Sequence, residues 1–125
     1  MAAPNIINAT SIYGKTVYDE DVAATESATL ANAASSNKLL KINTIIAANI
    51  DGTNDADITV YVSTASSATA LFYLAKTITV PADSSLVIIS KDTAFYMEED
   101  RAIRALASAA GDISLMVSFD ELDDA

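Results

Sequence analysis

The sequence predicts an all-β fold: a single antiparallel β-sandwich, jelly-roll or immunoglobulin-like, with about seven to nine short strands. Three observations support this prediction. Apolar and polar residues alternate with a period of two, short polar segments with Gly, Pro, Asp or Asn separate the alternating runs, and no helical apolar stripe is present. Such alternation is typical of sheets with one buried face and one solvated face.

Two segments show the alternation most clearly. Residues 57–63 place Ile58, Val60 and Val62 on one face. Residues 113–119 repeat the pattern, with the inward residues Ile113, Leu115, Val117 and Phe119. Both segments should be strands whose apolar face covers the core.

Further strands are expected at residues 6–17, 29–31, 38–50, 71–80, 85–90, 94–97 and 103–107. In the long segment 38–50, the residues Leu40, Ile42, Ile46, Ala48 and Ile50 share one parity and are expected on one face of the strand. In segment 71–80, the inward set is Phe72, Leu74, Ile78 and Val80. Segment 85–90 is apolar on both parities, which favours a central strand.

The whole chain, residues 1–125, is expected to form one domain. Segment 22–37 is rich in Ala and Ser and is interpreted as a loop or a ragged edge strand, with a short helix as the alternative. Residues 1–10 are expected to form an arm, and the acidic residues 120–125 a solvated tail.

The charge is strongly acidic, with 17 Asp and Glu against 7 Lys and Arg and a net charge of −10. Such a surface repels phosphate backbones, so no nucleic-acid partner is expected. The sequence shows no signal peptide and no apolar run long enough to cross a bilayer. We therefore expect no membrane partner and a soluble protein made in the cytoplasm.

The residues of common catalytic sites are missing. The sequence has no His and no Cys, and its three Gly residues form no phosphate-binding loop. No cofactor is expected, and the chain is interpreted as a protein that is not an enzyme.

One loop suggests a metal site. Asp51, Asn54, Asp55 and Asp57 bring together oxygen ligands of the kind that calcium prefers. Their spacing differs from that of an EF-hand loop, and a solvated turn stabilised by Asp and Asn is the favoured alternative.

Other residues are candidates for contacts between proteins. Tyr61 lies on the outward parity of its strand, and Tyr is common at interfaces. Small uncharged side chains on outward parities could pack against another flat surface at low desolvation cost; these are Thr59, Ser63, Ser114 and Ser118.

Several stretches resemble a family of small virion-associated proteins of tailed bacteriophages, common among marine and cyanobacterial phages. The resemblance spans nearly the whole chain and is carried by residues 1–6, 14–16, 32–38, 41–44, 48–52, 56–60, 74–82, 89–93, 96–99 and 107–112. One departure is Asp100-Arg101, where similar proteins have a Gly-Asp turn after the paired Glu. If that turn requires a positive φ, it must take a different form here.

The resemblance implies a β-sandwich subunit present in many copies on a phage particle. It favours a capsid decoration or cement protein that binds the major capsid protein or other virion proteins as a homo-oligomer, with a trimer weakly favoured. Localisation would be the virion, after synthesis in the host cytoplasm. The alternatives are a neck or tail component and a module that recognises glycans on the host surface.

Overall fold

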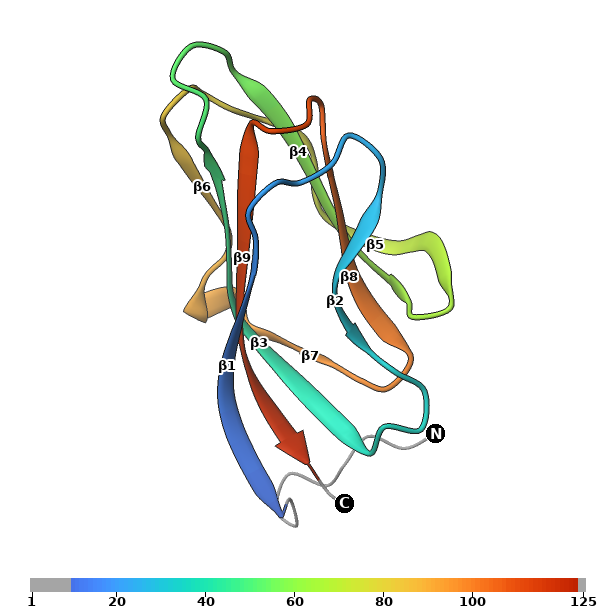
Figure 1. Ribbon diagram of the computed structural model, residues 1–125. Helices are drawn as coiled ribbons and strands as arrows, with labels where there is room; N and C mark the ends of the chain where they lie inside the picture. Colours follow the sequence, from blue (N-terminus) through green and yellow to red (C-terminus); the bar gives the residue numbers. More distant parts are fainter. Residues whose placement is uncertain (1–9, 124–125) are drawn as a thin grey trace.

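The computed structural model describes residues 10–123, which fold into nine strands and one short 3₁₀ helix (Figure 1). The elements are β1 (Ser11–Asp19), β2 (Ser27–Asn32), β3 (Lys38–Asn49), β4 (Ala56–Thr64), β5 (Ser67–Val80), β6 (Ser85–Ile89), η2 (Lys91–Thr93), β7 (Phe95–Met97), β8 (Arg101–Ala107) and β9 (Ile113–Asp123). The prediction of an all-β fold is confirmed.

Two antiparallel sheets form the sandwich. Sheet A has the order β1-β9-β3-β6, with β7 also paired to β3, and sheet B has the order β2-β8-β4-β5. The pairs are nested along the chain: β1 with β9, β2 with β8, β3 with β6 and β7, and β4 with β5. This is a long hairpin folded across two layers, the arrangement of a jelly roll.

The core lies between the sheets and follows the predicted alternation in β4 and β9. Ile58 and Val60 of β4 are fully buried, and β9 buries all four of its predicted inward residues. A single hydrophobic cluster joins them to side chains from the remaining strands. The alternation therefore identifies the core face of β9 and of β4 at Ile58 and Val60, whereas the third predicted inward residue of β4, Val62, is only half-buried.

A β-bulge in β3 overturns part of the prediction for segment 38–50. Ile42 lies opposite Phe119 and Thr44 opposite Ser118, so Asn43 is an extra residue in the ladder. The extra residue reverses the parity of the strand. Leu40 and Ile42 face the core as predicted, but beyond the bulge the buried residues are Ile45 and Ala47. The predicted inward residues Ile46, Ala48 and Ile50 were wrongly assigned, and Ile50 is 58% exposed.

Two predictions about the opposite edge of the sandwich are also wrong. Strand β6 lies at the edge of sheet A, not at its centre, and Val87 on it is 57% exposed. Strand β5 lies at the edge of sheet B, where Phe72 and Ile78 are exposed although Val80 is buried. An edge strand has a neighbour on one side alone, so inward parity does not ensure burial there.

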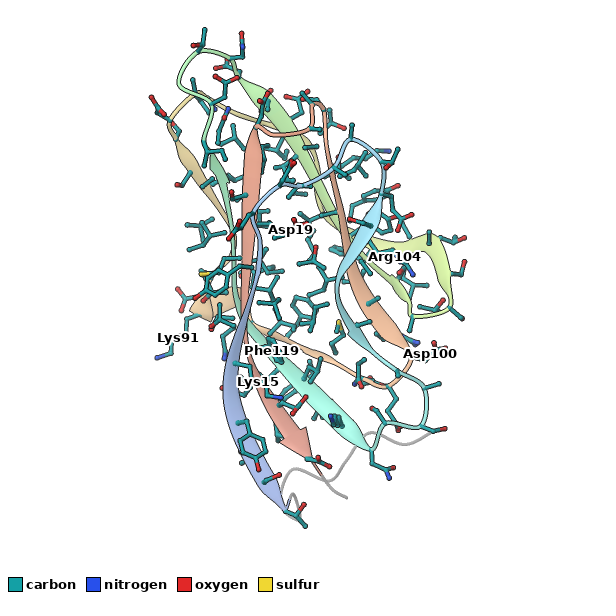
Figure 2. The ribbon with its side chains drawn as sticks, in the orientation of Figure 1. Lys15, Asp19, Lys91, Asp100, Arg104 and Phe119 are labelled. Atoms are coloured by element: carbon teal, nitrogen blue, oxygen red, sulfur yellow. The ribbon has the colours of Figure 1, made fainter. Side chains whose placement is uncertain are left out.

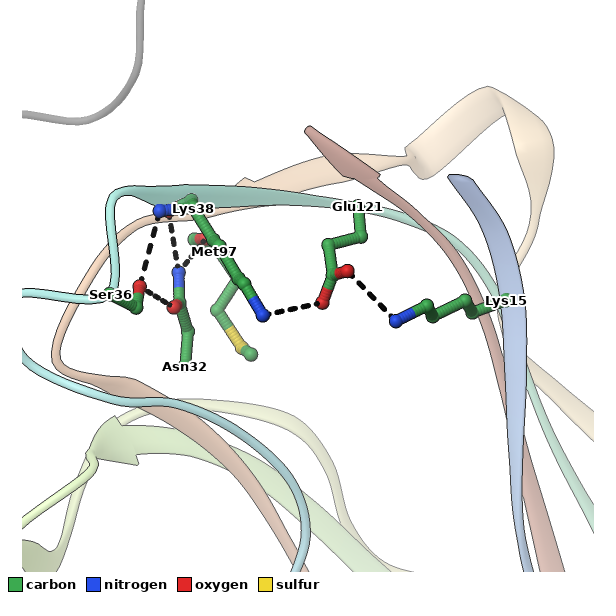
Figure 3. Close-up of polar contacts among 6 residues, drawn as sticks. All are labelled: Lys15, Asn32, Ser36, Lys38, Met97 and Glu121. Atoms are coloured by element: carbon green, nitrogen blue, oxygen red, sulfur yellow. Dashed lines mark hydrogen bonds and ion pairs between the residues drawn. The ribbon is translucent and has the colours of Figure 1, made fainter. Parts of the chain in front are cut away.

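Segment 22–37 contains the edge strand β2, in agreement with the favoured interpretation. The acidic segment differs from expectation, because β9 continues to Asp123 between β1 and β3. Glu121 bridges Lys15 of β1 at 2.8 Å and Lys38 of β3 at 3.5 Å (Figure 3). Its side chain is 13% exposed, so this part of the segment belongs to the sheet and is not a solvated tail. The proposed arm lies almost wholly outside the described residues.

The turn at Asp100 keeps the conformation that a glycine would favour. Asp100 has a φ of 59°, in the left-handed region, and its carboxylate accepts a hydrogen bond from the Ala65 backbone N–H at 3.2 Å. Asp tolerates this region better than most residues. The expectation that the turn must take a different form is therefore wrong.

We expect the protein to fold when Asn43 is deleted, because removal of the extra residue leaves a regular ladder in which Ile45 and Ala47 still face the core. Asn43→Ala keeps the bulge and should change the free energy of unfolding by less than about 1 kcal/mol. Urea denaturation followed by circular dichroism measures both variants. A deletion variant that fails to fold would contradict this assignment of the bulge.

Candidate interaction surfaces

The oxygens of the predicted calcium loop are engaged in separate hydrogen bonds. Asp51 accepts from the Thr53 backbone N–H at 2.8 Å and from the Asn54 amide at 3.2 Å. Asp55 accepts from the Ala82 N–H at 3.1 Å, whereas Asp57 accepts from the Thr79 hydroxyl at 2.7 Å. Within residues 10–123, no group of three or more acidic side chains is arranged to hold a metal ion. The contacts are those of a hydrogen-bonded turn.

Asp51 instead pairs with Asp112, which precedes β9. Partial burial raises the pKa of Asp112, and the neighbouring Asp51 carboxylate adds to this effect. Hydrogen bonds from Thr53 and Asn54 lower the pKa of Asp51. The two neighbouring carboxyl groups therefore differ, with the pKa of Asp51 lowered and the pKa of Asp112 raised.

Tyr61 and Ser63 are not available for contacts with another protein. Tyr61 is 5% exposed, with its ring centroid 5.4 Å from that of Tyr73, and Ser63 is fully buried. Burial raises the pKa of the Tyr61 hydroxyl, with a further contribution from Glu26. Both side chains lie away from the core, but residues of the same chain cover them on the outer face of sheet B.

Arg104 of β8 organises that cover (Figure 2). Its guanidinium donates to the Ser63 hydroxyl at 2.8 Å, to the Glu26 carboxylate at 2.6 Å and to the Ala65 carbonyl at 3.2 Å. The rigid fork thus connects β4, the β4–β5 turn and the segment before β2. We call this group, Glu26, Ser63, Ala65 and Arg104, the Arg104 clamp.

The remaining candidates lie in different places. The Thr59 hydroxyl accepts from the Thr77 N–H at 2.9 Å, which ties β4 to β5 on sheet B. Ser114 and Ser118 both lie on β9 of sheet A, and the Ser114 hydroxyl donates to the Glu20 carbonyl at 2.7 Å. The five candidates therefore do not form one surface, but two of them share a face of sheet A.

That face carries an apolar row across four strands. Tyr18 lies opposite Met116, Met116 opposite Ile46, and Ile46 opposite Val87. Opposed residues of antiparallel strands point to the same side, so the four side chains form a continuous row on the solvent face. Tyr18 is 72% exposed. We call the row and the small side chains that flank it the sheet A face; the flanking residues are Thr16, Thr44, Ala48, Ser85, Ser114 and Ser118.

The sheet A face has few charges for a protein of net charge −10. The next row contains Lys41 directly opposite Asp120, a pair of opposite sign. A shallow hollow of about 320 Å³ lies between Tyr18, Ile46 and Met116. Sequence reasoning missed Ile46 as an outward residue because the bulge at Asn43 leaves no recognisable signal in the sequence.

A second apolar hollow lies where β5 of sheet B approaches β6 and β7 of sheet A. It has a volume of about 460 Å³, and Leu71, Phe72 and Tyr96 are exposed along it. Glu98 and Arg101 are its charged lining residues. We call it the edge groove. Its size and apolar lining are those of surfaces that bind other molecules.

The Arg104 clamp predicts that Arg104→Lys destabilises the protein by about 1–3 kcal/mol, because an ammonium group cannot reproduce the three-way fork. Glu26→Gln should cost less than about 1 kcal/mol, since the Glu26 side chain is partly exposed and Arg104 keeps its other two partners. Chemical denaturation of both variants measures the difference. Equal stability of Arg104→Lys and the parent protein would contradict the clamp.

Asp112→Asn should raise the melting temperature at pH 7. The raised pKa of Asp112 means that its ionisation costs folded-state stability as pH rises through its titration range. Asn removes that cost and still donates to Asp51. The gain should vanish below about pH 3, where carboxyl groups are largely protonated. Asp92→Asn is the control, because it removes an equal charge from an exposed residue of η2. A gain that persists at low pH would contradict the pairing.

Comparison with known proteins shows similarity at the level of the fold. No protein-family model and no curated protein matches the sequence. A solved subunit of Bacillus endospore appendages, described as disulfide-linked pili, has 20% identity and a TM-score of 0.51, covering 92% of this chain and 90% of its own. Two structures of pentameric capsid proteins from metagenomic phage sequences have 14% identity and TM-scores of 0.38 and 0.35. They align with 97% of this chain, which spans about two thirds of their length, at 64% and 65%.

Proposed function

We propose that this chain is a non-enzymatic structural subunit of a tailed-phage particle, specifically a decoration or cement protein that binds the major capsid lattice. Binding through the sheet A face would bury the apolar row against neighbouring subunits. The proposal joins the resemblance in sequence to small virion proteins with a surface suited to passive, repeated contact.

The observation that carries the proposal is the sheet A face. Its apolar row crosses β1, β9, β3 and β6 without a charged residue in the row. The flanking Ser, Thr and Ala side chains are short, so a flat partner could approach closely and displace little bound water. An exposed sheet face with this composition is typical of a surface that becomes buried against a partner in an assembly.

The chemistry of the chain supports a passive role. The sequence contains neither His nor Cys. Within residues 10–123, the groups with a shifted pKa are Asp51, Tyr61 and Asp112. None of these three residues lines either apolar hollow.

The charge distribution also suits a particle component. The many acidic residues would keep copies dispersed in solution, while the uncharged row across the sheet A face would let one surface make close contact. Each contact can be weak, because many copies bound to one lattice act together.

Mapping this chain on intact particles by cryo-electron microscopy tests the proposal directly. A decoration protein should occupy the capsid surface in hundreds of copies, on the order expected for a lattice of repeated sites. Location at the neck or tail in a small ring would contradict the decoration role while preserving a virion role. Absence from particles would contradict both.

Met116→Glu should abolish binding to particles stripped of this protein, because it places a charge in the apolar row. We expect at least a tenfold loss of affinity, and the same for Ile46→Glu. Ile50→Glu is the matched control, since Ile50 is exposed but lies outside the row. Cosedimentation measures binding, and circular dichroism confirms folding. Full binding by both row variants would exclude the sheet A face.

A further inference from the structure

The hollow of about 320 Å³ beside the apolar row has a charged side. Its lining includes Tyr18, Ile46 and Met116 of the row, and also Asp19 and Glu20 at the point where β1 ends. The other lining residues are apolar or small and uncharged. An apolar hollow on the sheet A face is therefore bordered by two acidic residues.

The position of Glu20 is fixed by the neighbouring strand. Its backbone carbonyl accepts a hydrogen bond from the Ser114 hydroxyl at 2.7 Å. Ser114 lies on β9, two residues before Met116 and on the same outward parity. The Glu20 side chain itself is exposed. Glu20 is thus held beside the hollow before any partner binds, which lowers the entropy that binding would cost.

Neither acidic residue has a cationic partner within the chain. In the part of the chain that the structure describes, residues 10–123, the ion pairs are Lys15–Glu121, Lys38–Glu121 and Arg104–Glu26. Asp19 accepts a hydrogen bond from the Asp21 backbone N–H at 3.2 Å, which leaves its charge in place. A Lys or Arg from outside could therefore pair with either residue without breaking an existing ion pair.

More acidic groups lie at this end of sheet A. Asp21 follows Glu20, and its carboxylate accepts a hydrogen bond from the Gly111 N–H at 2.6 Å. Burial raises the pKa of Asp112, and the Asp51 and Asp21 carboxylates raise it further. Because these neighbours oppose the ionisation of another carboxyl group, the electrostatic potential at this end is negative.

The lining and the charge together restrict which side chain of a partner fits the hollow. An uncharged side chain would exclude water from the carboxylates without pairing with them, which costs free energy. An acidic side chain would be repelled. Arg and Lys have apolar stems and charged heads, so the stem can pack on Ile46 and Met116 while the head faces Asp19 and Glu20. The face of the Tyr18 ring also attracts a cation.

We propose that the hollow binds a basic side chain, Arg or Lys, that projects from the partner of the sheet A face. The inference rests on the proposed function, because it names what the partner must present where the sheet A face docks. The partner surface is then an apolar strip with a basic residue at one end. Since the acidic residues lie at one end of the sheet A face, the basic residue also fixes the orientation of the bound protein.

The first test uses the isolated protein and small probes. N-acetyl-arginine amide or N-acetyl-lysine amide should cause saturable NMR shifts at the backbone amides around the hollow, which are those of Tyr18, Glu20, Ser114 and Met116. N-acetyl-citrulline amide resembles the arginine probe but has no charge, so it should bind at least about tenfold more weakly. Equal binding of the citrulline probe, or no saturable shift with either basic probe, would overturn the inference.

The second test removes the acidic residues one at a time. Asp19→Asn and Glu20→Gln should each weaken binding to stripped particles by about threefold to tenfold at low salt, and by less at high salt. Asp92→Asn is the matched control, because it removes an equal charge from an exposed residue of η2 and should bind like the parent protein. Circular dichroism confirms that the variants fold. Unchanged binding by both hollow variants, or an equal loss with the control, would contradict a basic side chain in the hollow.

The two tests separate this inference from the proposed function. If the parent protein does not bind particles, the proposed function fails, while the probe titration still measures what the hollow binds. If the parent protein binds and the loss of Asp19 or Glu20 has no effect, the inference fails and the role on the lattice stands.

Discussion

The position of Asn43 decides which side of β3 faces the core, and much of the structure depends on it. β3 is the strand of sheet A that pairs with β9, β6 and β7, so its parity is shared with all of them. With one extra residue at the bulge, Ile45 and Ala47 complete the core that Leu40 and Ile42 begin. The same reversal brings Ile46 to the outer surface, where it joins Met116 and Val87. One backbone irregularity thus creates both a continuous interior and an apolar exterior row.

Sequence reasoning succeeded where burial depends on local alternation. β4 and β9 have regular inward residues because each lies between two paired strands. It failed where burial depends on distant neighbours. The apolar segment of β6 was expected to be central, but among the described residues 10–123 it is an edge strand of sheet A. Bulges and sheet edges arise from the pairing of remote segments, and a single sequence shows neither directly.

The candidate surfaces also divide into features that local alternation predicts and features that depend on distant segments. Ser114 and Ser118 were placed correctly on an outward parity, and they flank the apolar row. Tyr61 has the predicted parity, but Tyr73 lies against its ring and the Arg104 clamp adjoins it. The position of Arg104 relative to Ser63 and Glu26 depends on three strands and a turn, so spacing along the chain gave no indication of it. Asp100 shows the opposite error, because a turn expected to change kept its left-handed backbone.

The nested pairing of the strands constrains when this protein can fold during synthesis. β9 is the last of the nine strands within residues 10–123, yet it lies between β1 and β3 in sheet A. Until β9 leaves the ribosome, β1 has no partner in sheet A, and β3 can pair with β6 and β7 alone. Folds whose strands pair with partners far away in the sequence form slowly, and their intermediates expose apolar surface that favours aggregation. The high acidity of the chain would then act early, keeping nascent copies apart while each awaits its final strand.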